Sequence, residues 1–170
     1  MPVWILVLSQ LSVVTFALLG GVFLAFSDFI MRSLRLTGGA GGLEAMQVIN
    51  REVFRYVFMS LFIGMIPVSL VLAVGAYRNL AHSLPFLAAA TIYAVGVFGV
   101  TAACNVPMND TLAGLEATSA EGIAYWESTY LPRWTLWNSV RTAACLLASG
   151  LLQYGVCRAL LDCDGSNWRG

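Results

Sequence analysis

Three side chains that could bind a ligand lie along one face of the segment that leads into the last apolar stretch. Trp134, Asn138 and Arg141 occur at positions i, i+4 and i+7, which is the spacing of neighbours on one helix face. An indole, an amide and a guanidinium on the same face need polar partners. We therefore expect this face to meet polar groups of other segments.

The depth of Arg141 in a membrane can be estimated from the apolar chain that follows it. The 16 residues between Arg141 and Arg158 are uncharged and span about 24 Å as a helix, whereas a bilayer core of about 30 Å needs roughly 20 residues. At least one of these arginines therefore enters the apolar zone or reaches out of it. Arg141 either extends its charge to the interface, or faces the interior and pairs with a carboxylate or binds a ligand.

Other polar side chains stand near helix ends and have two interpretations each. Asp28 and Arg32 are four residues apart, which fits a surface ion pair, whereas an inward Asp28 would be a candidate base or the partner of Arg141. Asn105 and Asn109 flank Pro107. Their amides could satisfy backbone carbonyls at a helix end, or point into a cavity shared with Arg141.

Aromatic residues concentrate in the segment before the last apolar stretch. They either form an aromatic belt at a membrane interface or, because they lie close to Arg133 and Arg141, wall a flat ligand. These residues are Trp126, Tyr130, Trp134 and Trp137.

The composition is that of an integral membrane protein. Hydrophobic residues make up 59% of the 170 residues and charged residues 11%, whereas soluble domains have about 25% charged residues. The sequence has no run of basic residues, so nothing in it suggests binding to nucleic acid. One histidine and four cysteines without C-x-x-C spacing do not suggest a metal or cofactor site. Cys104 and Cys145 could form a disulfide or remain two buried thiols.

The elements that position these residues are expected to be helices, in a single domain over 1–170. Residues 1–27 carry no charged side chain; this run is too long for the apolar region of a signal peptide and fits a spanning helix. Pro107 and Pro132 are expected to end helices. The predicted fold is an all-α, four-transmembrane-helix bundle with spans at about 3–33, 56–77, 85–104 and 136–161, and amphipathic interfacial helices at about 43–55 and 120–130.

Four crossings would bring the polar candidates together at one end of the bundle. The amino terminus, the 78–84 connection and the carboxyl terminus would share the other end. The polar end would have six arginines and the other end three, which favours a cytoplasmic polar end. If the arginines that could belong to a site are left out, the two ends have nearly equal numbers. The orientation therefore stays open. The three arginines of the other end are Arg78, Arg158 and Arg169. The residues expected at the polar end are Asp28, Asn50, Arg51, Asn105, Asn109, Trp126, Arg133, Trp134, Asn138 and Arg141.

Four sequence pieces resemble a family of small four-helix membrane proteins related to fungal anthrone oxygenases, with bacterial members. They are F-L-A-F-S-D-F-I-M at 23–31, A-M-Q-V-I-N-R at 45–51, N-V-P-M-N-D at 105–110 and W-T-L-W-N-S-V-R-T-A at 134–143. They cover almost the whole chain in order. Family members often have proline where this chain has Arg32, which leaves the exit of the first helix less defined. We expect a multi-pass protein of a bacterial inner membrane.

The resemblance implies that dioxygen oxidises an anthrone to an anthraquinone without a bound cofactor. Asp28 would then be the base, while Arg141, Asn138 and Asn109 would stabilise the developing oxyanion. The flat rings would lie against Trp134 and Trp126. The full set expected to bind this hydrophobic aromatic substrate is Asn50, Asn105, Asn109, Trp126, Arg133 and Trp134.

A second interpretation is a non-catalytic accessory or structural subunit of a larger membrane complex. Such a subunit would bind lipid, quinone or pigment, and a homo-oligomer is also compatible with the sequence. Ala17, Gly21 and Ala25 recur every four residues, a pattern that lets a second helix approach closely in lipid. In either case membrane lipids are expected partners.

Overall fold

The computed structural model describes the backbone of residues 1–167 and the side chains of residues 1–162; the side chain of Arg169 lies outside the described residues. The described chain is all-α, and it contains four helices that are long and apolar enough to cross a membrane, at Val3–Leu36, Val57–Asn79, Leu84–Ala113 and Ala120–Asp162. The predicted class, a four-helix membrane bundle, is confirmed. The protein is a membrane protein.

The first, third and fourth spanning helices are each built from shorter α-helical and π-helical pieces, whereas the second is one continuous α-helix. The first comprises α1 (Val3–Ala25), η1 (Phe26–Ile30) and α2 (Met31–Leu36). The short α3 (Gly41–Glu52) and the 3-10 turn η2 (Val53–Arg55) precede α4 (Val57–Asn79). The third span comprises α5 (Leu84–Ile92), η3 (Tyr93–Gly99), η4 (Thr101–Asn105) and α6 (Val106–Ala113), and the fourth comprises α7 (Ala120–Tyr125), η5 (Trp126–Tyr130) and α8 (Leu131–Asn167).

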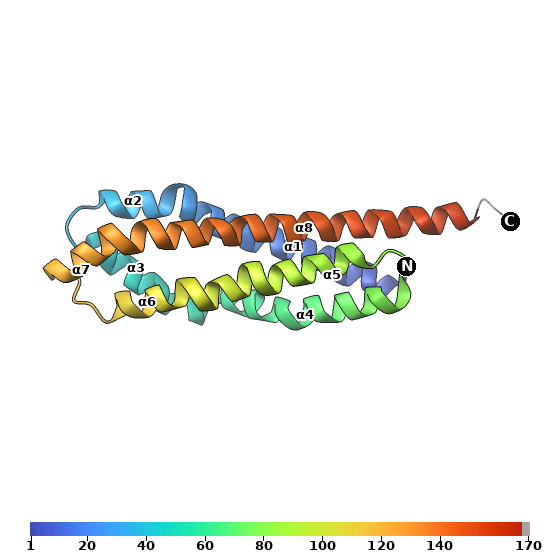
Figure 1. Ribbon diagram of the computed structural model, residues 1–170, viewed down its shortest axis with the longest axis horizontal. Coiled ribbons are helices and arrows are strands. Elements are labelled where there is room, and N and C mark those ends of the chain that lie inside the picture. Colours follow the sequence, from blue (N-terminus) through green and yellow to red (C-terminus); the bar gives the residue numbers. More distant parts are fainter. Residues whose placement is uncertain (168–170) are drawn as a thin grey trace.

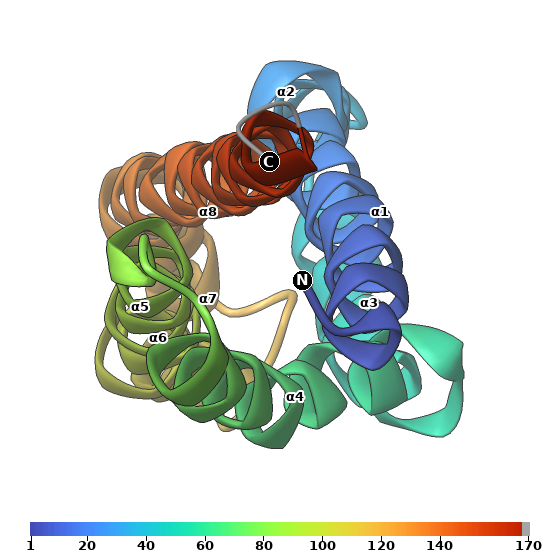
Figure 2. The ribbon, with the colours of Figure 1, turned by 90° about the vertical axis from the view of Figure 1, so that its right-hand side faces the viewer.

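The helices run antiparallel in a long bundle, and the extra helices gather at one end. Figure 1 shows α2, α3, α6 and α7 together at the left, while the amino terminus, the α4–α5 connection and the end of α8 lie at the right. Viewed along the bundle in Figure 2, α8, α1, α4 and α5 follow one another around a ring. This is the arrangement that four crossings predict, and it defines a polar end that holds α2, α3, α6 and α7.

The pairing of α1 with α8 explains which side chains point inward. Buried residues of α8 recur at alternating intervals of four and three, the repeat of helices that pack side by side at a shallow angle. Those of α1 follow the same repeat. The α8 series is Trp134, Asn138, Arg141, Cys145, Ala148 and Leu152, and the α1 series is Ile5, Ser9, Ser12, Phe16, Leu19 and Phe23. The polar residues of α8 therefore continue the same inward face as its apolar core residues.

A glycine allows α1 and α8 to approach closely. A Cβ on Gly20 would lie 3.0 Å from Cβ of Cys145, whereas one on Gly21 would meet nothing within 4 Å. Ala17 and Gly21 are exposed. The Ala17–Gly21–Ala25 strip consequently faces away from α8, and the close approach within the bundle uses Gly20. Cys104 and Cys145 are both free thiols, and Cys145 is buried.

Two expected helix ends are wrong, because neither Pro107 nor Pro132 terminates its helix. Pro107 lies in the first turn of α6 and Pro132 in the first turn of α8, and each follows a π-helical turn, η4 or η5. Proline lacks an N–H and crowds the carbonyl four residues earlier. A wide π turn moves the hydrogen bonds to partners five residues apart and makes room for the ring. The third span thus continues to Ala113, and the fourth begins at Ala120.

Residues 41–52 form the short helix α3 that precedes the second span, whereas the segment expected as a separate interfacial helix at 120–130 is continuous with α8, so that α7, η5 and α8 form one helix. The glycine-rich linker becomes a tight turn, in which Gly38 and Gly39 have positive φ angles of 74° and 53°. Gln47 of α3 donates from Nε2 to the carbonyl oxygens of Leu112 and Leu115 at 2.8 and 3.0 Å. Because these carbonyls lie in the last turn of α6 and just beyond it, the contact caps α6 and holds α3 against it.

Candidate functional site

The polar end of α8 directs a guanidinium into the bundle. Arg141 is only 6% exposed. Its Nη2 donates to Oδ1 of Asn138 at 2.7 Å, and its Nη1 donates to Oγ1 of Thr101, on the third span, at 3.2 Å. Its Cζ lies 4.4 Å from the ring centroid of Phe23 and 5.3 Å from that of Trp134. Of the two alternatives for Arg141, the structure therefore has the inward one, with contacts to two other spans.

Asn138 joins α8 to the junction of α1 and η1. Its Nδ2 donates to the carbonyl oxygen of Phe23 and to Oγ of Ser27, each at 2.6 Å. Its Oδ1 accepts the bond from Arg141. Every polar atom of this fully buried amide is therefore occupied, which fixes its orientation and, through it, the position of the guanidinium.

The charge of Arg141 has no negative partner among the described side chains. The ion pairs found there are Arg55 with Glu52 and His82 with Asp162. The Nε of Arg141 is buried and has no hydrogen-bond partner, while the partners of Nη1 and Nη2 are neutral oxygens. Burying an unpaired charge costs several kcal/mol, and two aromatic faces compensate only part of that cost. Such a group is able to bind an anion.

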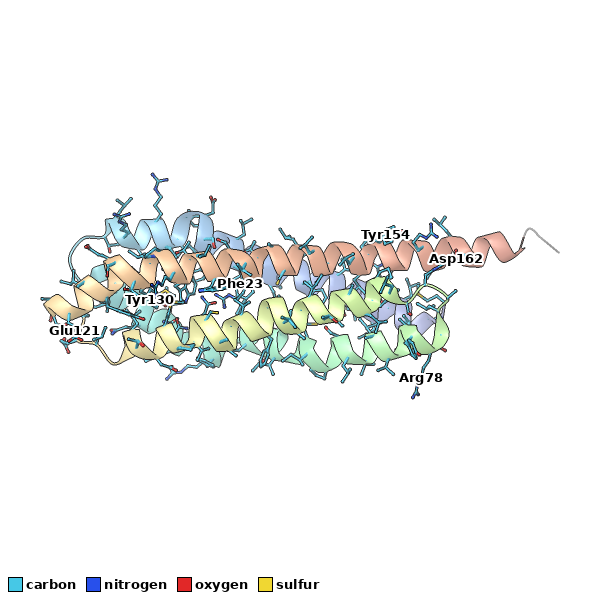
Figure 3. The ribbon with its side chains drawn as sticks, in the orientation of Figure 1. Phe23, Arg78, Glu121, Tyr130, Tyr154 and Asp162 are labelled. Atoms are coloured by element: carbon cyan, nitrogen blue, oxygen red, sulfur yellow. The ribbon has the colours of Figure 1, made fainter. Side chains whose placement is uncertain are left out.

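A second polar layer holds an aromatic stack next to Arg141. Oδ1 of Asn109 accepts from the hydroxyl of Tyr130 at 2.8 Å and from Nε1 of Trp134 at 2.9 Å. Nδ2 of Asn50 donates to the same hydroxyl at 3.2 Å. The ring of Tyr130 stacks between those of Trp126 and Trp134, with centroids 5.5 and 6.0 Å away. Figure 3 shows Tyr130 and Phe23 between the helices at the polar end, far from Arg78 and Asp162.

These groups border a cavity of about 430 Å³ at the polar end. That volume lies within the range of about 300 to 1,000 Å³ that is typical of small-molecule sites. Nine of the nineteen lining residues are aromatic or methionine, among them Phe23, Phe58, Phe62 and Met59. The polar side chains of the lining are Asn50, Glu52, Thr101, Asn109, Asn138 and Arg141. The cavity is thus suited to a flat apolar molecule with an oxygen at one edge.

Five of the candidates from the sequence line this cavity, and four do not. Asn50, Asn109, Trp134, Asn138 and Arg141 line it. Two of the others are buried beside it: Trp126 stacks on Tyr130, and Nδ2 of Asn105 donates to the carbonyl oxygen of Trp134 at 3.2 Å. These two support the wall instead of lining the cavity.

The expected placement of Asp28 and Arg133 in the site is not what the structure has. Both side chains are exposed and absent from the lining, because their neighbours Ser27 and Trp134 take the inward positions. The alternative ion pair between Asp28 and Arg32 is also absent from the described side chains, whose two ion pairs involve other residues. Asp28 is therefore not positioned to act as the base.

The sequence did not single out Thr101, Ser27, Phe23 or Glu52. Thr101 and Ser27 are small hydroxyl residues in apolar helices, where such residues commonly bond their own backbone. Phe23 is one of many apolar residues of α1, with nothing to distinguish it. Glu52 was expected on the solvated side of an amphipathic helix. Its position next to the last inward-facing residues of α3 is the feature of the sequence that could have indicated its place at the cavity.

The fold and the site define a class: a small four-helix membrane protein with a cavity that is walled by aromatic rings and contains a buried cation with no ion-pair partner among the described residues. The family model described as anthrone oxygenase matches residues 53–151. This match covers more than half of the chain, so the protein belongs to the anthrone oxygenase family, as its sequence pieces predicted. The matched part includes Asn109, Trp134, Asn138 and Arg141 but begins just after α3. No curated protein and no solved structure matches the chain.

Proposed function

We propose that the protein binds an anthrone-like, flat polycyclic phenol in the polar-end cavity and oxidises it with dioxygen to the quinone. The observation that carries this is the buried guanidinium of Arg141, which lacks a negative partner among the side chains of residues 1–162 and borders a cavity with aromatic walls. Membership of the anthrone oxygenase family supports the same substrate class. In this reaction a ring CH₂ and one O₂ give one ring C=O and one water.

Arg141 and Asn138 would act on the oxygen at the edge of the ligand. When the CH₂ group loses a proton, the electron pair of that C–H bond delocalises through the ring and the negative charge collects on the carbonyl oxygen opposite. A guanidinium at that oxygen stabilises the charge as it develops. The resulting electron-rich anion then donates an electron to dioxygen. Asn138 contributes by holding Nη2 of Arg141 at 2.7 Å.

The apolar walls would perform two further tasks. They bind the ring system, because aromatic side chains contribute large apolar contact areas. They also exclude water, which strengthens the electrostatic interaction between Arg141 and the ligand oxygen. Asn109 accepts hydrogen bonds from the hydroxyl of Tyr130 and the indole of Trp134, and so keeps Trp134 of the wall and the ring stacked behind it in place.

The test is oxidation of 1,8-dihydroxy-9-anthrone by the purified protein in detergent. Oxygen consumption and the anthraquinone absorbance are followed, and with ¹⁸O₂ the new carbonyl should carry one labelled oxygen. Arg141→Ala should lower the rate by about 100-fold or more, the effect of removing one oxyanion-stabilising group. Arg133→Ala removes an exposed arginine of the same helix and should leave the rate unchanged.

Two results would contradict this function. One is a wild-type rate in Arg141→Ala. The other is a wild-type protein that binds the anthrone without accelerating its oxidation over the protein-free reaction, which would instead favour a non-catalytic binding subunit. Asn138→Ala, which leaves Nη2 of Arg141 without its acceptor, should lose most of the rate while the protein remains folded in detergent.

A further inference from the structure

Deprotonation of the ligand requires a group that accepts a proton, and the cavity offers one carboxylate. Glu52 is the one acidic residue among the described side chains that line the cavity. We infer that Glu52, which lies immediately before the part of the chain that the family model matches, is the general base that removes the proton from the ring CH₂. This inference rests on the proposed oxidation, and it replaces Asp28, whose side chain is exposed outside the cavity.

Glu52 is the last residue of α3, next to the residues that bring α3 against the cavity. Met46, Ile49, Asn50 and Val53 line the same cavity and recur at intervals of three and four, so this side of α3 faces the ligand. The hydrogen bond from Asn50 to Tyr130 at 3.2 Å fixes the helix close to the aromatic stack. The end of α3 thus places a carboxylate at the cavity instead of in open solvent.

Glu52 and Arg141 lie at different depths of the cavity. The side chain of Glu52 is 38% exposed, whereas Arg141 is 6% exposed. Arg141 therefore marks the closed end and Glu52 the open end. An anthrone has its carbonyl and its CH₂ group on opposite edges of the central ring, so a ligand whose oxygen contacts Arg141 presents its CH₂ group toward the open end, where Glu52 is located.

Arg55 orients the carboxylate without blocking it. Nη1 of Arg55 lies 3.0 Å from Oε1 of Glu52 and 3.3 Å from Oε2, so one donor is shared between the two oxygens and each oxygen keeps a free lone pair. In the step itself the C–H bond breaks, an O–H bond forms on Glu52, and the negative charge passes to the ligand oxygen at Arg141. The partial exposure of Glu52 then lets its proton leave to water.

The experiment compares Glu52→Gln with Glu44→Gln, which removes an exposed carboxylate from the same helix. The probe is 1,8-dihydroxy-9-anthrone. Binding is measured by quenching of tryptophan fluorescence, and proton removal is measured without oxygen as exchange of the CH₂ hydrogens with D₂O. Glu52→Gln should bind the probe within about threefold of wild type and lose about 100-fold or more in exchange and in aerobic oxidation, the usual scale of general-base catalysis. Glu44→Gln should match wild type in all three measurements.

The outcomes separate the base from the function. Wild-type exchange and oxidation rates in Glu52→Gln would overturn the role of Glu52 and leave the oxidation intact. Loss of probe binding in Glu52→Gln would also overturn it, because the residue would then hold the ligand or the fold. A wild-type protein that binds the probe but neither exchanges nor oxidises it would overturn both. Restoration of exchange by added formate in Glu52→Ala would support the assignment, since a free carboxylate would replace the missing one.

Discussion

The hydroxyl of Tyr130 connects three elements of the polar end. It donates to Oδ1 of Asn109 in α6 at 2.8 Å and accepts from Nδ2 of Asn50 in α3 at 3.2 Å, while its ring stacks on Trp134 of α8. It does not line the cavity. Tyr130 is accordingly a positioning residue that holds the wall and α3 in register.

Tyr130→Phe should weaken substrate binding more than it slows the chemistry. Loss of the hydroxyl leaves Nδ2 of Asn50 without its acceptor and costs about 1 to 2 kcal/mol, which loosens α3 at the cavity. We expect KM for 1,8-dihydroxy-9-anthrone to rise severalfold with kcat within about twofold, measured by anthraquinone formation. Tyr154→Phe, at an exposed tyrosine near the other end, is the matched control. A large loss of kcat at unchanged KM would contradict a positioning role.

Charged and amide side chains of the site could be predicted from the sequence, whereas its hydroxyl side chains and the direction in which each side chain points could not. The spacing of Trp134, Asn138 and Arg141 was sufficient to place all three on one face, and they are buried together. Thr101 gave no signal, because its hydroxyl also donates to the carbonyl of Val97 at 2.7 Å, a bond that any threonine in a helix can make. The prediction that Asp28 faces inward was wrong because a charged residue at the end of a span can point either into the bundle or out of it.

The four π-helical turns of residues 1–167 all lie in the first, third and fourth spans, and three of them surround the site. Of these three, η1 contributes Ser27, η4 contributes Thr101 and Asn105, and η5 contributes Trp126 and Tyr130. Such turns are frequent at functional sites because they alter side-chain direction locally without ending the helix. The two prolines were predicted to end helices, because the residue type alone does not reveal whether the preceding turn is wide enough to accept the proline ring.

The close packing of α1 against α8 should be sensitive to one glycine and insensitive to its neighbour. Gly20→Val adds a Cβ 3.0 Å from that of Cys145, and overpacking of this kind costs about 1 to 3 kcal/mol. Separation of the two helices would also lengthen the 2.6 Å bond from Asn138 to the carbonyl of Phe23. We expect a lower thermal unfolding temperature in detergent and reduced oxidation.

Gly21→Val is the control for this substitution. Its Cβ would meet nothing within 4 Å, so stability and activity should remain close to those of wild type. Equal destabilisation by the two substitutions would show that the effect comes from the residue type and not from the α1–α8 contact. If Gly21→Val changed only the oligomeric state, the strip of Ala17, Gly21 and Ala25 would contact a second chain. The unfolding temperature of a monomer would not detect such a contact.

Helix positions were easier to predict than helix faces because the surrounding medium is itself apolar. In α1 the inward Phe16 and Leu19 and the outward Leu11 and Leu18 are equally hydrophobic. A lipid-facing surface therefore lacks the polar stripe that reveals the exposed face of a helix in a soluble protein. Orientation could be inferred where polar residues interrupt the apolar sequence, as in α3 and the start of α8.

The whole molecule places its connections at two ends, and this arrangement followed from the number of crossings. The loop between α6 and α7 lies at the polar end and the connection of α4 with α5 at the other (Figure 1). Counting residues between charges gave the four spans and thus the topology. The lengths of the third and fourth spans were underestimated because both continue through a proline.

The topology can be tested with an epitope at residue 116 and another at the carboxyl end, each in an otherwise unchanged protein. In sealed vesicles the two epitopes should be accessible from opposite sides, and an epitope at residue 81 should behave like that at the carboxyl end. Accessibility of residues 81 and 116 from the same side would contradict the four-crossing bundle. The arginine distribution leads us to expect residue 116 on the cytoplasmic side.

The cavity is bordered by the break between η2 and α4, where the chain exposes apolar surface. Phe54, Tyr56 and Val57 are 65%, 66% and 70% exposed, and Phe54 and Tyr56 belong to the lining. A polycyclic ligand that dissolves in lipid would reach these rings by lateral diffusion within the membrane. Its effective concentration for the protein is then a mole fraction in the bilayer or micelle, so added detergent dilutes the substrate even when the total amount in the sample is constant.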